Sequence, residues 1–205
     1  MVSLPKTVPV MAFLAGALLA GAVAAQERTI LSRSQWNANP PSQEMPANAA
    51  LRLTIHHTAT RQNPARPLAT KLKSLQAFSQ SRSKLADGRT KPAWGDVPYH
   101  FYIGADGGIA EGREVRFVGD TNTNYDPYGH VSIVVEGNFE IEQPSPLQIA
   151  ALEHLLVHLA LTYGLTADNI DSHRSFAATA CPGENLLALM PDIKADVARR
   201  LQALR

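Results

Sequence analysis

The chain has 205 residues, the length of one domain, and a single cysteine, Cys181, so no disulfide can form within it. Its 19 lysines and arginines nearly balance its 18 aspartates and glutamates, which excludes the basic surface of a nucleic-acid-binding protein. A chain of this length buries about 70% of the surface that its unfolded form exposes, so a core can form without disulfides.

The sequence predicts a signal peptide at residues 1–25. This segment carries one cation, Lys6, and no acid, and an apolar run extends from Val8 to Ala24. Ala22-Val23-Ala24 has the small-x-small pattern that precedes signal cleavage. A retained membrane anchor is the alternative, but a run of about 17 residues is short for a span. We therefore expect export to the periplasm or secretion, with no stable membrane span after cleavage.

Residues 26–50 form a predicted lead-in segment, because Pro40, Pro41 and Pro46 exclude a regular helix or a central strand there. The largest apolar side chain of this segment is Trp36, which we expect to pack onto the surface of the domain or to line the edge of a groove. Residues 51–205 are expected to form the folded domain.

The first predicted strand spans residues 51–57, where apolar and polar side chains alternate. His56 and His57 are neighbours in this strand and point to opposite faces of the sheet, so only one of them can readily serve a given site. Further along, the patterns predict an amphipathic helix over 67–85, a hairpin over 99–112 and an interior strand over 131–135.

The strongest helix signal begins at Ser145, which caps the helix, with proline at the first helical position and Gln148 completing a capping box. Gly164 ends this helix, and a second amphipathic helix is predicted over 187–204. Strands mixed with helices predict an α/β fold of one domain, in which a central mixed β-sheet is covered by α-helices.

A metal site is predicted near the end of the chain. The segment 171–186 offers an imidazole at His173, a hydroxyl at Thr179 and a thiol at Cys181, and zinc prefers imidazole nitrogen and thiolate sulfur as ligands. Two ligands do not hold a catalytic zinc, so a third is expected from the strand over 51–57. The alternative is an ordinary surface histidine and a buried, inert cysteine.

Two other histidines have metal-like spacing on a predicted helix. His154 and His158 lie four residues apart, but the zinc-protease pattern needs a glutamate at 155, where the chain has Leu155. We interpret both histidines as the ordinary flank of a helix. His130 precedes a strand and is predicted to be structural or exposed.

Three ordered motifs resemble those of the zinc-dependent N-acetylmuramoyl-L-alanine amidases. They are Ile55-His56-His57-Thr58, Tyr99-His100-Phe101 with Asp106-Gly107, and His173 followed by Cys181-Pro182-Gly183; Glu111-Gly112-Arg113 and Gly137-Asn138-Phe139 are further matches. This family includes the phage lysozyme-amidases and the peptidoglycan recognition proteins. The resemblance implies the fold of that family, with residues 51–205 as a zinc amidase catalytic domain.

The resemblance also implies roles for particular residues. It assigns Zn²⁺ to His56, His173 and Cys181, and it makes Tyr99 and Thr179 the catalytic residues that donate hydrogen bonds to the developing oxyanion. His57, His100 and Arg113 are implied substrate-binding residues; His57 and His100 either line the groove or support the residues that form the site. The expected partner is peptidoglycan or a muropeptide. The expected reaction is hydrolysis of the amide bond between N-acetylmuramic acid and the L-alanine of the stem peptide.

The sequence departs from one branch of the family at the catalytic base. Relatives that recycle cell-wall fragments carry a glutamate in the strand before the glycine of Gly137-Asn138-Phe139, and alignment on Gly137 puts Val134 there. Glu136 shares a face with Val134 and is close enough along the strand to reach the site.

Two other functions stay open at this stage. One is a module that recognises peptidoglycan without cutting it. The other is a thiol hydrolase, with Cys181 as nucleophile and His173 as base.

Overall fold

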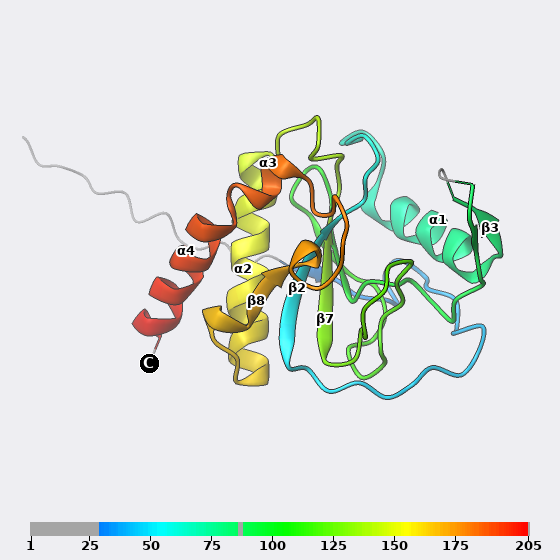
Figure 1. Ribbon diagram of the computed structural model, residues 1–205, viewed down its shortest axis with the longest axis horizontal. Coiled ribbons are helices and arrows are strands. Elements are labelled where there is room, and N and C mark those ends of the chain that lie inside the picture. Colours follow the sequence, from blue (N-terminus) through cyan, green and yellow to red (C-terminus); the bar gives the residue numbers. More distant parts are fainter. Residues whose placement is uncertain (1–28, 86–87, 205) are drawn as a thin grey trace, which may run out of the picture.

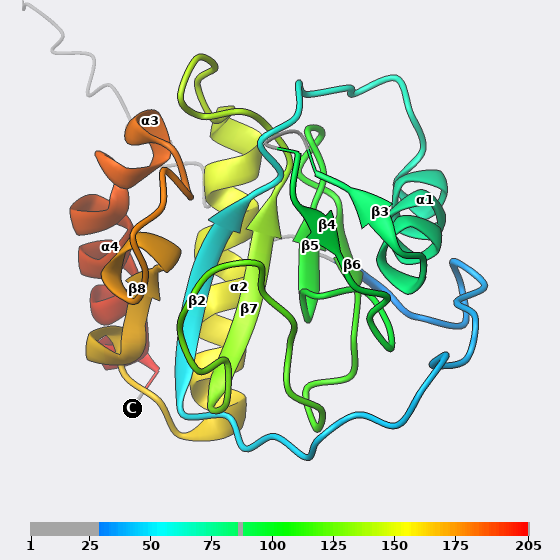
Figure 2. The ribbon, with the colours of Figure 1, turned by 45° about the vertical axis from the view of Figure 1, so that its right-hand side comes forward.

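The computed structural model describes residues 29–85 and 88–204, so the predicted signal peptide at 1–25 lies outside the described residues. Its centre is a six-stranded sheet (Figures 1 and 2). In spatial order the strands are β1 (Ile30–Leu31), β6 (Ile109–Glu111), β5 (Phe101–Ile103), β7 (His130–Val135), β2 (Arg52–His57) and β8 (Ile170–Ser172). Only β5 and β6 pair antiparallel. The predicted mixed sheet is therefore confirmed.

Helices cover both faces of the sheet. On one face lie α2 (Pro146–Tyr163), α3 (Glu184–Leu187) and α4 (Met190–Ala203), and on the other lies α1 (Leu68–Gln80) (Figures 1 and 2). Short 3₁₀ turns at Ala167–Asn169 and His173–Ser175 flank β8, and β3 (Ser83–Lys84) pairs with β4 (Thr90–Lys91) beside α1. Within the described residues, no helix has the length and apolar content needed to cross a membrane.

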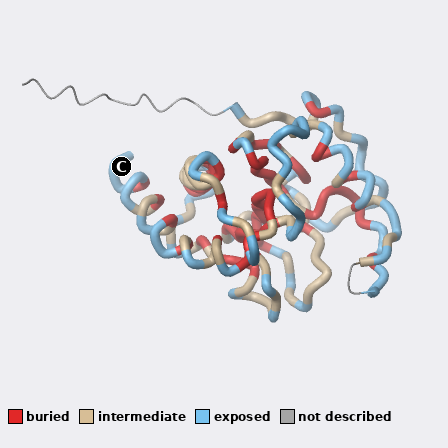
Figure 3. Tube along the Cα trace, turned by 90° about the horizontal axis from the view of Figure 1, so that it is seen from above, coloured by how far each residue is buried: buried red, intermediate tan, exposed pale blue. Residues whose placement is uncertain are grey.

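The alternation of side chains along β2 and β7 divides the core into two parts. Leu53 and Ile55 of β2 and Ile133 of β7 face α2 and join its leucines in the larger cluster. The opposite face carries the smaller cluster under α1, which includes Tyr102 and Val134. Buried segments gather in the middle of the molecule, and exposed ones lie on the outer helices and loops (Figure 3). The predicted strands at 51–57 and 131–135 are thus confirmed as interior strands.

Two of the predicted helices differ in extent from the structure. The helix expected over 67–85 ends at Gln80, because the β3–β4 hairpin follows and the buried ammonium of Lys91 binds the carbonyls of Ser79 and Ser81, each at 2.8 Å. The helix expected over 187–204 corresponds to α4, which begins at Met190, and the separate short helix α3 precedes it and ends at Leu187. Pro191 lies in the first turn of α4, where it lacks an N–H and its ring would clash with the carbonyl four residues earlier in a continuous helix.

The lead-in segment contributes to the core. Its strand β1 pairs parallel with β6 at the edge of the sheet. Trp36 is 0% exposed, packs in the cluster under α1 and donates its Nε1–H to the carbonyl of Glu111 at 2.7 Å. Trp36 thus packs onto the domain, the first of the two expectations, and it lies deeper than expected, inside the core. β8 was not predicted, since three residues with a central aspartate give too short a pattern.

The N-terminus of α2 gives the first testable prediction. Ser145 accepts the N–H of Gln148 at 3.2 Å, and Gln148 returns a bond to the N–H of Ser145 at 3.0 Å, as the capping box predicts. A Ser145→Ala substitution should lower the free energy of unfolding by about 1 kcal/mol, because one N–H of the first turn loses its acceptor. Urea denaturation will measure this change. Thr70→Ala, at an exposed position of α1, is the matched control and should be nearly neutral.

Candidate metal centre

Three side chains from distant parts of the chain converge beside the sheet. His56 comes from β2, His173 from the turn that follows β8, and Cys181 from the loop after that turn. One donor atom from each of the three lies within 4.8 Å of the others. Nδ1 of His56 is 3.7 Å from Sγ of Cys181, and the rings of His56 and His173 are 4.6 Å apart. The structure thus brings together the three residues that the resemblance proposed as ligands.

The pairing of strands explains this convergence. β2 and β8 run parallel, with Leu53 opposite Ile170 and Ile55 opposite Ser172. His56 and His173 are the next residue in each strand's direction, so both imidazoles reach the same level of the sheet. The chain then needs only one loop to return Cys181 to them.

The donor atoms fit a tetrahedral cation such as zinc. Usual zinc–nitrogen and zinc–sulfur bond lengths place two such ligands about 3.6 Å apart, close to the 3.7 Å between His56 Nδ1 and Cys181 Sγ. Within the described part of the chain, no oxygen bonds to either ring nitrogen of His56, and its Nε2 is buried without a partner. The imidazole of His56 is therefore available to a cation.

Burial sets the protonation of the three groups. It lowers the pKa of His56 well below 6.5, with a further contribution from His173, and it lowers the pKa of His173 to about 4. Both imidazoles are neutral at pH 7, as a metal ligand must be. Burial raises the pKa of the Cys181 thiol to about 12, and the N–H of His57 at 3.4 Å offsets this only in part. A thiolate here needs a nearby cation, which a bound metal would provide.

Thr123 orients one of the imidazoles. Its hydroxyl lies 2.7 Å from Nε2 of His173, so an N–H donated at Nε2 leaves the lone pair on Nδ1. Metal-binding histidines usually use their second nitrogen in this way. Sequence reasoning missed Thr123, because it lies in an irregular loop with no motif around it.

Arg174 holds the loop that carries Cys181. Its Nε binds the carbonyl of Thr179 at 3.1 Å and its Nη2 binds the carbonyl of Ala180 at 3.0 Å, while Nη1 pairs with Glu184 at 2.5 Å. The residue after one proposed ligand therefore binds the two residues before another. Only the planar guanidinium of arginine presents donors in such a fork.

The two predicted catalytic residues each lie next to one of the proposed ligands. The ring of Tyr99 is 5.2 Å from that of His56, and burial raises the pKa of its hydroxyl, with a smaller contribution from Cys181. Tyr99 is therefore a neutral donor. Thr179 is half-buried, and its Oγ1 accepts the N–H of Cys181 at 3.2 Å, which leaves its own proton free to donate.

The three predicted substrate-binding residues do not line the groove beside Tyr99, and His100 and Arg113 line a separate pocket with residues of β1 and α2. His57 is 6% exposed, faces away from His56, and accepts the N–H of Phe139 at its Nδ1 at 3.3 Å. Arg113 is 2% exposed, and its guanidinium binds the carbonyls of Val97, Asp96 and Val118 and pairs with Asp120. Both side chains therefore bond to neighbouring parts of the chain, and their contact with substrate stays a prediction.

His100 is likewise a structural residue. It is 0% exposed, and its Nε2 lies 2.9 Å from the carbonyl of Phe117, while Nδ1 accepts the N–H of Ser132 at 2.8 Å. Both nitrogens are occupied, which agrees with the supporting role that was one of the two expectations for His100. His130 is 2% exposed, bonds Thr54 at 2.7 Å and packs on Phe176, as its predicted structural role requires.

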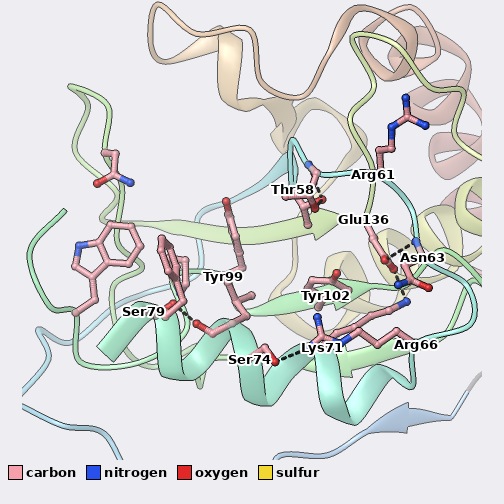
Figure 4. Close-up of a pocket in the computed structure, with 16 residues that line it drawn as sticks. Thr58, Arg61, Asn63, Arg66, Lys71, Ser74, Ser79, Tyr99, Tyr102 and Glu136 are labelled. Atoms are coloured by element: carbon pink, nitrogen blue, oxygen red, sulfur yellow. Dashed lines mark hydrogen bonds and ion pairs between the residues drawn. The ribbon is translucent and has the colours of Figure 1, made fainter. Parts of the chain in front are cut away.

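A groove of about 560 Å³ adjoins the metal centre on the α1 side of the sheet (Figure 4). Tyr99 belongs to both the groove and the centre, since it lines the first and contacts His56 of the second. Residues of α1, including Lys71, Ser74 and Ser79, form one wall (Figure 4). A substrate in this groove would pass Tyr99 and reach the donor atoms beside it.

The description of a known family fits this arrangement. The sequence model for the N-acetylmuramoyl-L-alanine amidases matches residues 46–184, which is more than half of the chain. The chain belongs to this family. The N-acetylmuramoyl-L-alanine amidase of Sus scrofa is 30% identical over 185 residues, and the match covers 82% of this chain and 29% of the pig protein.

Other members of this amidase family carry recognition in their names. Peptidoglycan-recognition protein SD of Drosophila simulans is 32% identical over 189 residues, covering 85% of this chain and 92% of that protein. A crystal structure of the Drosophila recognition protein SD superposes with a TM-score of 0.69 at 30% identity, covering 80% of this chain and 94% of the other. The comparisons support either a peptidoglycan amidase or a protein of the recognition type.

This amidase-family chain has no free carboxylate at the position where the recycling relatives have their base. Val134 pairs with His56 across β2 and β7 and is 0% exposed. Glu136 lies two residues on and lines the groove, but it is only 4% exposed. It pairs with Lys71 at 2.7 Å and accepts the N–H groups of Asn63 at 3.0 Å and Ala105 at 2.8 Å.

The buried histidines give a prediction about pH. Burial lowers the pKa of His100 to about 4 from 6.5, and the bond to Phe117 offsets part of this effect. The unfolded chain therefore binds more protons than the folded one between these values, so stability present above pH 6.5 is lost as the pH falls toward 4. Urea denaturation at pH 7 and at pH 5 should show lower stability at pH 5.

A variant separates His100 from the other histidines. His100→Gln removes the titrating group, so the loss of stability between pH 7 and pH 5 should be smaller than in the unmodified protein. An unchanged pH dependence in this variant would mean that His100 does not contribute.

Proposed function

We propose that this chain is a zinc-dependent N-acetylmuramoyl-L-alanine amidase. It would hydrolyse the amide bond between N-acetylmuramic acid and the L-alanine of the peptidoglycan stem peptide. The observation that carries the proposal is the convergence of His56, His173 and Cys181 within 4.8 Å, next to a groove lined by Tyr99. Membership of the amidase family supports the substrate class.

The proposed chemistry combines a metal with two hydroxyl donors. Zinc bound by the three residues would supply a Lewis acid that polarises the scissile carbonyl and lowers the pKa of a water molecule toward about 7. Tyr99 and Thr179 hold neutral hydroxyls beside the centre, and each can donate a hydrogen bond to the oxygen that gains charge in the transition state. Thr123 and Arg174 orient His173 and the Cys181 loop, and so keep the donor atoms in place.

A recognition module without hydrolysis is the second candidate, because several relatives are named as recognition proteins. The complete set of two imidazoles and one thiol favours the enzyme. Mass analysis of muropeptides after incubation with the protein distinguishes the two functions, since only an amidase releases free stem peptide.

A thiol hydrolase is disfavoured by the surroundings of Cys181. A nucleophilic cysteine has a lowered pKa, whereas burial raises the pKa of Cys181 to about 12. Inhibition by chelators together with resistance to alkylating reagents supports the metal enzyme.

We also propose that the protein acts outside the cytoplasm, in the periplasm or after secretion. This rests on the apolar segment and cleavage pattern of residues 1–25. Peptidoglycan lies in the same compartment, so the predicted location and the proposed substrate agree.

The zinc ligands can be tested by metal content. The purified protein should contain about one zinc per chain. The Cys181→Ser variant should lose most of this zinc, and its affinity for zinc should fall by more than about 100-fold. Elemental analysis and zinc titration with a competing chelator will measure both. If the serine variant retains full zinc content and full activity, Cys181 is not a ligand.

Tyr99 can be tested separately from the metal. Tyr99→Phe removes one hydroxyl donor and should lower kcat by about 100-fold to 1000-fold, with the zinc content unchanged. Steady-state hydrolysis of a muramoyl peptide gives kcat, and elemental analysis gives the zinc content of the same sample. Loss of zinc in this variant would instead show that Tyr99 supports the metal site.

A further inference from the structure

Tyr102 is a buried tyrosine of the groove floor that the proposed chemistry does not use. It lies on β5 and is 6% exposed, and its ring packs in the cluster that also holds Trp36 and Leu72. Yet the residue lines the groove, where it lies between Thr58 and the α1 side chains (Figure 4). Close packing fixes the ring, so the hydroxyl has a fixed position at the groove surface.

The hydroxyl of Tyr102 has no hydrogen-bond partner among the residues that the structure describes. The oxygen is not one of the buried polar atoms without a partner, so it faces the solvent of the groove that Tyr102 lines. A ligand in the groove that displaces this solvent would meet a hydroxyl that no side chain of the described residues engages.

The charged side chains near the Tyr102 hydroxyl do not form a hydrogen bond with it, because they are bonded to other groups. Glu136, the nearest acid, already accepts hydrogen bonds from Lys71 and from two backbone N–H groups. The guanidinium of Arg66 binds the hydroxyl of Ser74. Burial, followed by the charge of Glu136, raises the pKa of Tyr102, so its O–H stays protonated and can donate at neutral pH.

Strand register gives the distance from the metal centre. Tyr102 and His56 both pair with Val134, from opposite sides of β7. All three therefore lie in one row on one face, and two strand spacings separate the outer residues by about 10 Å. An extended peptide covers about 10 Å in three residues, so a stem peptide whose scissile amide lies at the centre is long enough to reach Tyr102.

We propose that the hydroxyl of Tyr102 donates a hydrogen bond to an oxygen acceptor of the muramoyl peptide, and so fixes the substrate on the groove floor. The acceptor is an amide or carboxylate oxygen of the stem peptide or the acetamido oxygen of the sugar. This proposal rests on the proposed function for the identity of the ligand. It makes Tyr102 a substrate-binding residue that no motif indicated.

The experiment compares the zinc-loaded protein with its Tyr102→Phe variant, which removes one oxygen and keeps the ring. Both proteins carry Tyr99→Phe, which slows cleavage, and mass analysis after each titration confirms that the ligand is intact. Calorimetry measures the Kd of a muramoyl tripeptide and of the free tripeptide. We expect Tyr102→Phe to raise the Kd of the muramoyl tripeptide about threefold to tenfold, with zinc content and Tm unchanged.

The two ligands identify the source of the acceptor. If Tyr102→Phe weakens the binding of both ligands, the acceptor lies on the peptide. If it weakens the binding of the muramoyl tripeptide alone, the acceptor lies on the sugar. Tyr163→Phe is the matched control, since Tyr163 lies on α2 and is 37% exposed; it should change neither Kd. In the protein with Tyr99 intact, Tyr102→Phe should raise KM by the same factor.

Some results would overturn this proposal. A Kd unchanged within about twofold for both ligands, or a fall in Tm that accounts for the weaker binding, rejects the role of Tyr102. These results are independent of the proposed function. If the unmodified protein binds muramoyl peptide without cutting it, the amidase proposal fails while the test of Tyr102 still applies.

Discussion

The parallel pairing of β2 with β8 is the interaction on which the metal centre depends. His56 and Cys181 are 125 positions apart in the sequence, and nothing local holds them together. The pairing sets His173 next to His56, and the loop held by Arg174 then returns Cys181. The helices α2, α3 and α4 bury the opposite face of these strands, so the hydrophobic core fixes the spacing of the donor atoms.

Burial prepares the two imidazoles for a cation but opposes ionisation of the thiol. It removes the proton from each imidazole and retains the proton on the thiol, because in each case the neutral form is favoured away from water. Two lone pairs are thereby available, and the thiol loses its proton when a divalent ion supplies the compensating charge. The buried charge in the groove needs no added cation, because the carboxylate of Glu136 is already paired with the ammonium of Lys71.

Much of this architecture could be predicted from the sequence. Periodicity found the interior strands and the capped helix α2, because these elements follow local rules of alternation and capping. The face of His56 followed from strand parity alone. The motif resemblance then supplied the distant partners His173 and Cys181, which no local rule connects.

The sequence did not show the contacts that depend on distant neighbours. Arg113 and His100 match family positions, but no pattern predicts that both bond to the loop from 114 to 120. The depth of Trp36 depends on the pairing of β1 with β6, which could not be seen from a segment rich in proline. Thr123 and Arg174 were missed since their partners are a side chain and two carbonyls fixed only by the fold.

Glu136, two residues after the Val134 that pairs with His56, shows what strand alternation can and cannot predict. Parity predicts that Glu136 shares the face of Val134, and the structure agrees, since both contribute to the α1 side of the sheet. Parity does not predict that Lys71, 65 positions away, pairs with the carboxylate. The side chain beside His56 is the apolar Val134, and the carboxylate of Glu136 is paired with Lys71. The side chains next to the proposed ligands that can donate to a substrate are therefore the hydroxyls of Tyr99 and Thr179. Transition-state stabilisation in this protein would therefore depend on Tyr99 and Thr179, whose protons remain available at neutral pH.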